Sequence, residues 1–90
     1  MIKLPNPPTT YLGVVIHQAA DDGCFIGYGS SKSEIKYGVK ERSSEEDFKT
    51  FRMWKLPVPS HSFVSTYQSG SLCSLLKNIE RLEGEEILDD

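Results

Sequence analysis

The fold is decided by residues 11–29, which read YLGVVIHQAADDGCFIGYG. The first seven residues alternate as in a strand, with Leu12, Val14 and Ile16 on one face. Their β-branched side chains favour a strand that is at least partly buried on both faces. Asp22-Gly23 is a hairpin signal, and the residues from Cys24 onward then form the returning strand. We therefore expect an antiparallel β-hairpin at the start of the fold.

Residues 34–40 show the clearest two-residue period in the chain. Apolar Ile35, Tyr37 and Val39 alternate with polar or small residues, a pattern typical of a half-buried strand. A short polar loop, residues 30–33, separates this segment from the hairpin. The sequence therefore predicts an antiparallel meander of three strands.

Residues 43–56 change to a helical period. Ser44 is followed by three acidic residues, which suits an N-cap and the positive end of a helix dipole. Phe48, Phe51 and Trp54 then recur every third residue, and a proline follows at position 57. We predict one helix here. A strand stays open as the alternative, because Phe51 and Met53 also alternate.

The rest of the chain predicts one more strand and one more helix. Residues 57–60 form a stiff proline-containing connector, residues 62–68 are strand-like, and residues 71–82 carry a helical apolar stripe that Gly84 ends. The predicted order is β-β-β-α-β-α. It describes an α+β fold with an antiparallel sheet of about four strands, one packed helix and a C-terminal helix.

The chain has room for a single domain. Its 90 residues divide into a proline-rich extended arm at 1–10, the domain at 11–84 and an acidic tail at 85–90. The arm lacks the apolar stretch of a signal peptide, and the longest apolar cluster is too short to cross a membrane. We therefore expect a cytoplasmic protein with reduced thiols at its two cysteines, Cys24 and Cys73.

Composition and spacing disfavour catalysis. Ten basic residues against 13 acidic ones give a net charge of −3, which also disfavours non-specific nucleic-acid binding. The two histidines and two cysteines show no metal-ligand spacing, and Ser60-His61-Ser62 places neighbouring side chains on opposite sides of an extended segment. We expect no metal, no cofactor and no enzymatic activity.

One stretch resembles the HicB-like antitoxin domain. The matching features are the strands Val14–His17 and Cys24–Tyr28, the predicted third strand at 34–40, the turn Asp21–Gly23, the helix start Ser44–Phe48 and the connector Leu56–Ser60. The family's proline- and glycine-rich loop between strands two and three is replaced by residues 30–33. In place of the family's separate DNA-binding domain, we expect only one helix and a tail. The resemblance implies a partly RNase-H-like fold that binds and blocks a small basic toxin nuclease.

The same hairpin is also similar to the GIY-YIG nuclease domain. Gly13–Val15 and Phe25–Gly27, followed by Ser30–Lys32, look like that family's opening strands, with Val15 and Phe25 at the places of its motif tyrosines. The resemblance would assign the arginine role to Arg42 and the catalytic acid to Glu80 or Glu83. Because the tyrosines are lost, it implies a degenerate relative.

The preferred prediction is a non-enzymatic protein-binding or inhibitor module, antitoxin-like, with another protein as its partner. Two surfaces are candidates: a sheet edge near residues 32–40 that could accept a partner strand, and the acidic C-terminus, which could occupy a basic active site. The partner-binding residues are Lys32, Lys36, Lys40, Glu83, Glu85, Glu86, Ile87 and Leu88. The alternatives are a nuclease relative and a small nucleic-acid-binding module, and a homodimer through an edge strand stays open.

Overall fold

The predicted hairpin forms the centre of the structure. The computed structural model describes residues 9–66 and 71–87. Strands β1 (Thr10–His17) and β2 (Gly23–Gly29) pair antiparallel, with Tyr11 opposite Gly29 and His17 opposite Gly23. The turn between them carries Asp22 at a φ of 56°, which confirms the hairpin signal at Asp22-Gly23.

Two further strands complete an antiparallel sheet of four strands in the order β2-β1-β3-β4. Strand β3 (Arg52–Leu56) pairs with the other side of β1, and β4 (Glu85–Ile87) pairs with β3. The predicted α+β class and its four antiparallel strands are confirmed.

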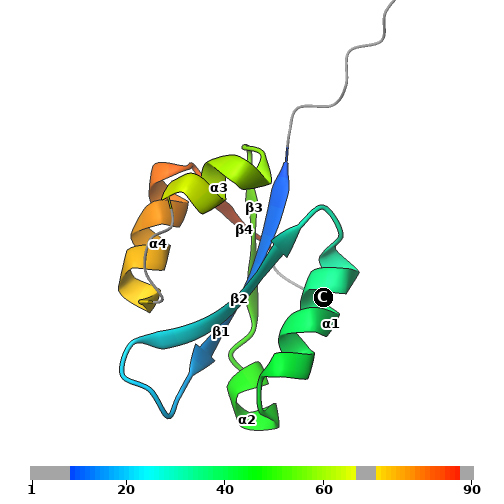
Figure 1. Cartoon of the computed structure of the whole chain (residues 1–90), viewed down its shortest axis with the longest axis vertical. Coiled ribbons are helices and arrows are strands. Elements are labelled where there is room, and N and C mark those ends of the chain that lie inside the picture. Colours follow the sequence, from blue (N-terminus) through cyan, green and yellow to red (C-terminus); the bar gives the residue numbers. More distant parts are fainter. Residues whose placement is uncertain (1–8, 67–70, 88–90) are drawn as a thin grey trace, which may run out of the picture.

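Helices cover both faces of this sheet (Figure 1). Helices α1 (Lys32–Arg42) and α2 (Glu45–Phe48) lie on one side, and α3 (Ser60–Thr66) and α4 (Leu72–Arg81) lie on the other. Each side has its own apolar core. We call them the α1-side cluster, built on Val15, Ile35, Val39 and Met53, and the α4-side cluster, built on Leu12, Val14, Trp54, Leu56, Phe63, Leu75 and Ile79.

The predicted third strand is wrong, because residues 32–42 form helix α1. Ser31 caps this helix by accepting a hydrogen bond from the Glu34 N–H. Ile35 and Val39 are four residues apart, so both face the sheet from one side of a helix. Tyr37, which strand alternation would bury, is 66% exposed.

The predicted helix at 43–56 is also wrong beyond its first turn. Ser44 caps α2 as predicted, accepting from the Asp47 N–H, but the chain is extended again from Arg52. The aromatic residues therefore divide between the two faces of the sheet. Phe51 packs on the α1-side cluster and Trp54 belongs to the α4-side cluster, so the strand left open in the sequence analysis is the one that forms.

The predicted fourth strand at 62–68 is a helix, α3, as far as Thr66. The Ser65 and Thr66 hydroxyls donate back to the Ser62 carbonyl oxygen, and this local bonding offsets the strand preference of β-branched residues. Helix α4 confirms the predicted C-terminal helix. The observed order is β-β-α-α-β-α-α-β.

Part of the predicted acidic tail belongs to the sheet, because Glu85–Ile87 form β4. The predicted N-terminal arm lies outside the described residues except for its last two positions, and Thr10 is already in β1. In the described part of the chain, no helix has the length and apolar character needed to cross a membrane.

Candidate functional site

Helix α1 carries a row of three exposed lysines along one flank. Lys32, Lys36 and Lys40 are spaced four residues apart, so they rise along the helix by about 6 Å per step. We call them the lysine row. The predicted strand would have alternated these side chains with apolar ones, whereas the helix aligns them in a single line.

Each ammonium of the lysine row lies over an aromatic ring. The distances from Nζ to the ring centre are 5.2 Å for Lys32 over Tyr11, 5.8 Å for Lys36 over Phe51 and 5.9 Å for Lys40 over Phe48. A cation over a ring face gains about 0.5–1 kcal/mol at an exposed site. The rings therefore hold three flexible side chains in place while their charge stays at the surface.

Tyr11 lies in β1, whereas Phe48 and Phe51 lie in the segment of α2 and its connection to β3. Polar contacts hold this second segment in place. The Asp47 carboxylate accepts from His17 Nδ1 at 2.9 Å and from the Gln18 N–H at 3.2 Å. The Thr50 hydroxyl accepts from the Ile16 N–H at 2.8 Å and donates to the Asp47 carbonyl at 2.6 Å. These bonds tie the segment of α2 to the end of β1, and they set where Phe48 and Phe51 lie beneath α1.

The same contacts explain the electrostatics of Asp47. The hydrogen bond from His17 lowers the pKa of the Asp47 carboxyl, the Gln18 N–H lowers it further, and burial opposes both. Among the described residues, Asp47 is the only charged residue that is buried. The sequence holds no local signal for this pair, because its two members are 30 residues apart.

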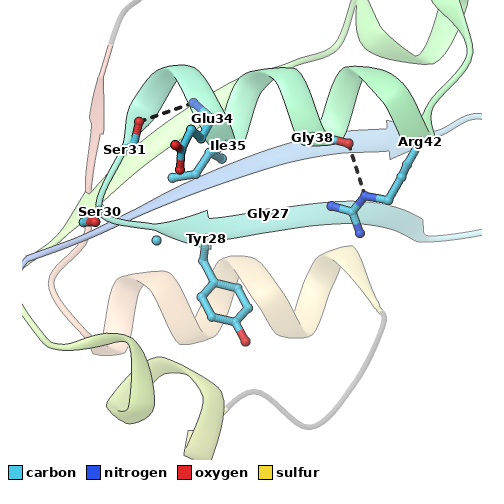
Figure 2. Close-up of a pocket in the computed structure, with 9 residues that line it drawn as sticks. Gly27, Tyr28, Ser30, Ser31, Glu34, Ile35, Gly38 and Arg42 are labelled. Atoms are coloured by element: carbon cyan, nitrogen blue, oxygen red, sulfur yellow. Dashed lines mark hydrogen bonds between the residues drawn. The ribbon is translucent and has the colours of Figure 1, made fainter.

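A groove runs along the other flank of α1, between the helix and β2 (Figure 2). Its volume is about 190 Å³. Arg42 lies at one end, where its guanidinium donates to the carbonyl oxygens of Gly38 (3.3 Å) and Ile26. We call this feature the α1–β2 groove. Its lining comprises Gly27, Tyr28, Gly29, Ser30, Ser31, Glu34, Ile35, Gly38 and Arg42.

The predicted acidic surface is largely engaged within the fold. Glu86 accepts two hydrogen bonds from the Arg52 guanidinium, at 3.0 and 2.6 Å, and this pair lowers the pKa of Glu86 and raises that of Arg52. Glu85 lies opposite Lys55 in the sheet, and Ile87 packs on the α1-side cluster.

Two of the predicted acidic-surface residues lie elsewhere. Glu83 is in the turn after α4, at a φ of 59°, and Leu88 is outside the described residues. The structure thus separates the predicted binding residues into the lysine row on α1 and an acidic group on β4 and its preceding turn.

The positions that the nuclease resemblance would use do not converge. Val15 and Phe25 are opposite each other in the hairpin, but Val15 is fully buried and Phe25 packs against the His17 ring at 4.9 Å. Glu80 belongs to α4, which packs on the opposite face of the sheet. The third strand that supported the antitoxin resemblance is helical.

Comparison of the chain with protein-family models, curated proteins and solved structures finds no match. Within residues 9–66 and 71–87, no three His, Cys, Asp or Glu side chains are grouped so that they could hold a metal ion. The candidate site therefore rests on the geometry of α1 and of the segments that pack beneath it.

Proposed function

We propose that this chain is a non-enzymatic protein-binding module whose binding face is centred on the lysine row. The observation that carries the proposal is the set of three ammoniums, each over an aromatic ring, on one exposed helix flank. Surface lysines ordinarily lose side-chain entropy when they bind a partner. Here the rings have already restricted them, so less entropy remains to be lost.

The chemistry of this face calls for an acidic partner surface. Three positive charges about 6 Å apart match a helix or strand that presents carboxylates at a similar spacing. Lys55 lies on the same side of the sheet as Met53 and Tyr11, because alternate residues of β3 face the α1 side. It extends the positive surface beyond α1.

Binding is favoured over catalysis by the placement of the groups that catalysis would need. In the nuclease alternative, a tyrosine pair, an arginine and an acid must meet at one reacting phosphate. Here the corresponding positions are apolar or lie on opposite faces of the sheet.

An inhibitor role, in which the bound partner is an enzyme that the chain blocks, stays a prediction from the antitoxin resemblance. The resemblance implies a basic enzyme, which the lysine row would repel, so such an enzyme would have to bind the acidic group on β4. A basic partner would have to displace Arg52 from Glu86, a pair held by two hydrogen bonds.

The test is an affinity capture with the tagged chain from nuclease-treated native lysate. The bound proteins are identified by mass spectrometry and their binding is remeasured with purified components. We expect one dominant acidic partner, bound by the wild-type chain and lost by a variant carrying Lys32→Gln, Lys36→Gln and Lys40→Gln. Lys77→Gln is the matched control, since Lys77 is an exposed lysine on α4.

Two outcomes would overturn the proposal. If the triple variant captures the partner as well as the wild-type chain does, the lysine row is not the binding face. If all capture disappears after nuclease treatment and purified single-stranded nucleic acid binds instead, the nucleic-acid alternative is correct. Its affinity would then fall steeply with salt.

A further inference from the structure

Strand β2 is an edge of the described sheet, and its backbone has a defined outward side. The Ile16 N–H bonds to Thr50 on the β3 side of β1, so the even-numbered residues of β1 face β3 and the odd-numbered ones face β2. The odd-numbered residues of β2 therefore pair with β1. The backbone N–H and C=O groups of Ile26 and Tyr28 therefore point away from β1, toward the outer edge of the sheet. The hydrogen bond from Arg42 to the Ile26 carbonyl agrees with this direction.

The first half of this edge is already covered. Gly23 forms a bridge with Ser71, and the Leu72 N–H donates to the Asp22 carbonyl at 2.9 Å. The part of the outer edge beyond this bridge runs from Ile26 to Tyr28, and within it the Ile26 carbonyl already accepts one hydrogen bond from the Arg42 guanidinium. Its midpoint is Gly27.

The flank of α1 that borders this edge has a symmetric charge pattern. Glu34, Gly38 and Arg42 all line the α1–β2 groove and are spaced four residues apart. Within the described chain, the Glu34 carboxylate makes no ion pair and the Arg42 guanidinium bonds only to backbone carbonyls. An acid and a base thus lie about 6 Å on either side of a central glycine.

Gly27, the midpoint of the open part of β2, and Gly38, the central residue of the charge pattern on α1, lie at the same position along the edge of the sheet. A Cβ at Gly27 would meet Val39 Cγ2 at 2.9 Å and Ile35 Cγ2 at 3.4 Å, so Gly27 lies beneath the residues that bracket Gly38. Gly38 itself has no atom within 4 Å of an added Cβ. A single two-fold axis perpendicular to the sheet can therefore pass close to both glycines.

We propose that two copies of this chain associate about that axis, with β2 paired antiparallel to β2 of the second copy. The Ile26 N–H of each copy donates to the Tyr28 carbonyl of the other, and the Tyr28 N–H donates to the Ile26 carbonyl, whose second lone pair stays with Arg42. The two α1 helices run antiparallel, so Glu34 of each copy meets Arg42 of the other. Because the interface is isologous, both the strand pairing and the ion pair occur twice.

The side chains at this edge suit such a contact. Ile26 and Tyr28 lie on the α4 side of the sheet, and the Tyr28 ring is 45% exposed, with Phe63 at 5.6 Å on its inner side. Pairing places Ile26 of the second copy next to the exposed part of this ring. β-branched and aromatic side chains pack well as cross-strand neighbours.

The dimer is independent of the proposed binding function. The lysine row contacts rings on the β1 and β3 side of α1, whereas the dimer uses the flank that faces the edge of β2. The association can therefore fail while partner binding at the lysine row persists, or the reverse.

Sedimentation equilibrium of the purified chain tests the proposal. We expect the wild-type chain to be a dimer of the 10.1 kDa protomer at about 100 µM, and either Glu34→Arg or Arg42→Glu to raise its Kd about tenfold or more. The double variant restores both ion pairs with their signs exchanged, so its Kd should return to within about threefold of the wild-type value. Glu80→Arg and Arg81→Glu on α4 are the charge-matched controls.

Crosslinking tests the position of the axis in folded protein. In a background carrying Cys24→Ala and Cys73→Ser, which removes both native thiols, a short bis-maleimide should link Gly38→Cys into covalent dimers. The adjacent solvent-facing Tyr37→Cys should give few. A monomeric wild-type chain at all concentrations would overturn the dimer. A double variant that stays dissociated while circular dichroism shows it folded, or equal crosslinking at both positions, would overturn the proposed register.

Discussion

At the scale of single residues, the Asp47–His17 pair makes the fold sensitive to acid. A carboxyl whose pKa is lowered by folding stabilises the native state above its ordinary pKa. The contribution is lost as the pH falls through the lower, folded-state value. We expect Asp47→Asn to lower the free energy of unfolding at pH 7, and its difference from the wild type to shrink below about pH 4.

Urea unfolding of both proteins between neutral pH and pH 2.5 measures this difference. Asp21→Asn is the control, since Asp21 is an exposed acid in the β1–β2 turn. A difference between Asp47→Asn and the wild type that stays constant over the whole range would contradict the expectation.

Gly84 joins α4 to β4, and its missing side chain is a packing requirement. A Cβ there would approach Ile79 Cγ2 and Leu56 Cδ2 to 2.6 Å each. Because both neighbours belong to the α4-side cluster, they cannot move without disturbing the core. We expect Gly84→Ala to destabilise the fold by about 1–3 kcal/mol, measured by chemical denaturation. An unchanged denaturation midpoint would show that the connection between α4 and β4 can move enough to accommodate a Cβ.

Residue-scale features were predictable from the sequence only where they are local. The Ser44 cap follows from the residues beside it, and the structure confirms it. The same is true of the turn at Asp22-Gly23. The Asp47–His17 bond has no local signal, because it depends on where α2 lies relative to the end of β1.

At the scale of elements, Ser31 determines where α1 begins. Its hydroxyl accepts the Glu34 N–H that the first turn leaves without a partner. We expect Ser31→Ala to cost about 1 kcal/mol of stability, and Ser30→Ala, at the exposed residue before the cap, to cost much less. Thermal unfolding followed by circular dichroism compares the two variants. Equal losses would mean that the cap is not what starts the helix.

The errors at this scale have one physical origin. Ile35 and Val39 are separated by four residues, a spacing that fits both a strand of period two and a helix of period 3.6. Signals at the ends of the segment distinguish the helix from the strand. They are the Ser31 cap and the basic Lys40 and Arg42 in the last turn. Alternation in the middle of the segment favours a strand, and only those ends distinguish the helix.

The segment after α2 shows the opposite case, in which a spacing that suits a helix belongs to a strand. The aromatic spacing from Phe48 to Trp54 resembles a helix, but β3 sends alternate residues to opposite cores. Met53 is buried in the α1-side cluster and Trp54 in the α4-side cluster. Such a strand, buried on both faces, has no polar side to reveal its period. The lysine row could not be recognised from the sequence until α1 was known to be helical.

At the scale of the whole molecule, one sheet separates two cores and couples them. Ile35 and Leu75 belong to different clusters, yet each packs on the same strands. We expect Ile35→Ala and Leu75→Ala each to cost about 2–5 kcal/mol and each to lower a single transition. Trp54 fluorescence and far-ultraviolet circular dichroism should give coincident curves. Separate transitions would show that the two layers unfold independently.

The global arrangement was partly predictable. Hydrophobic patterning and length predicted the α+β class and the number of strands, both of which the sheet confirms. The patterning identified β1 and β2, but it placed the other two strands in the wrong segments. β4 was assigned to an acidic tail, because three residues with two glutamates carry almost no strand signal. Its pairing depends on β3 being present beside it.

Strand β4, at the edge of the sheet opposite β2, affects how readily this protein aggregates in solution. β4 is only three residues long, and Glu85 and Glu86 place two like charges on it. A strand this short and this charged is a poor template for stacking one molecule upon the next. Growth of the sheet at this border would bury acidic side chains against each other, so concentrated samples should resist conversion into amyloid fibrils.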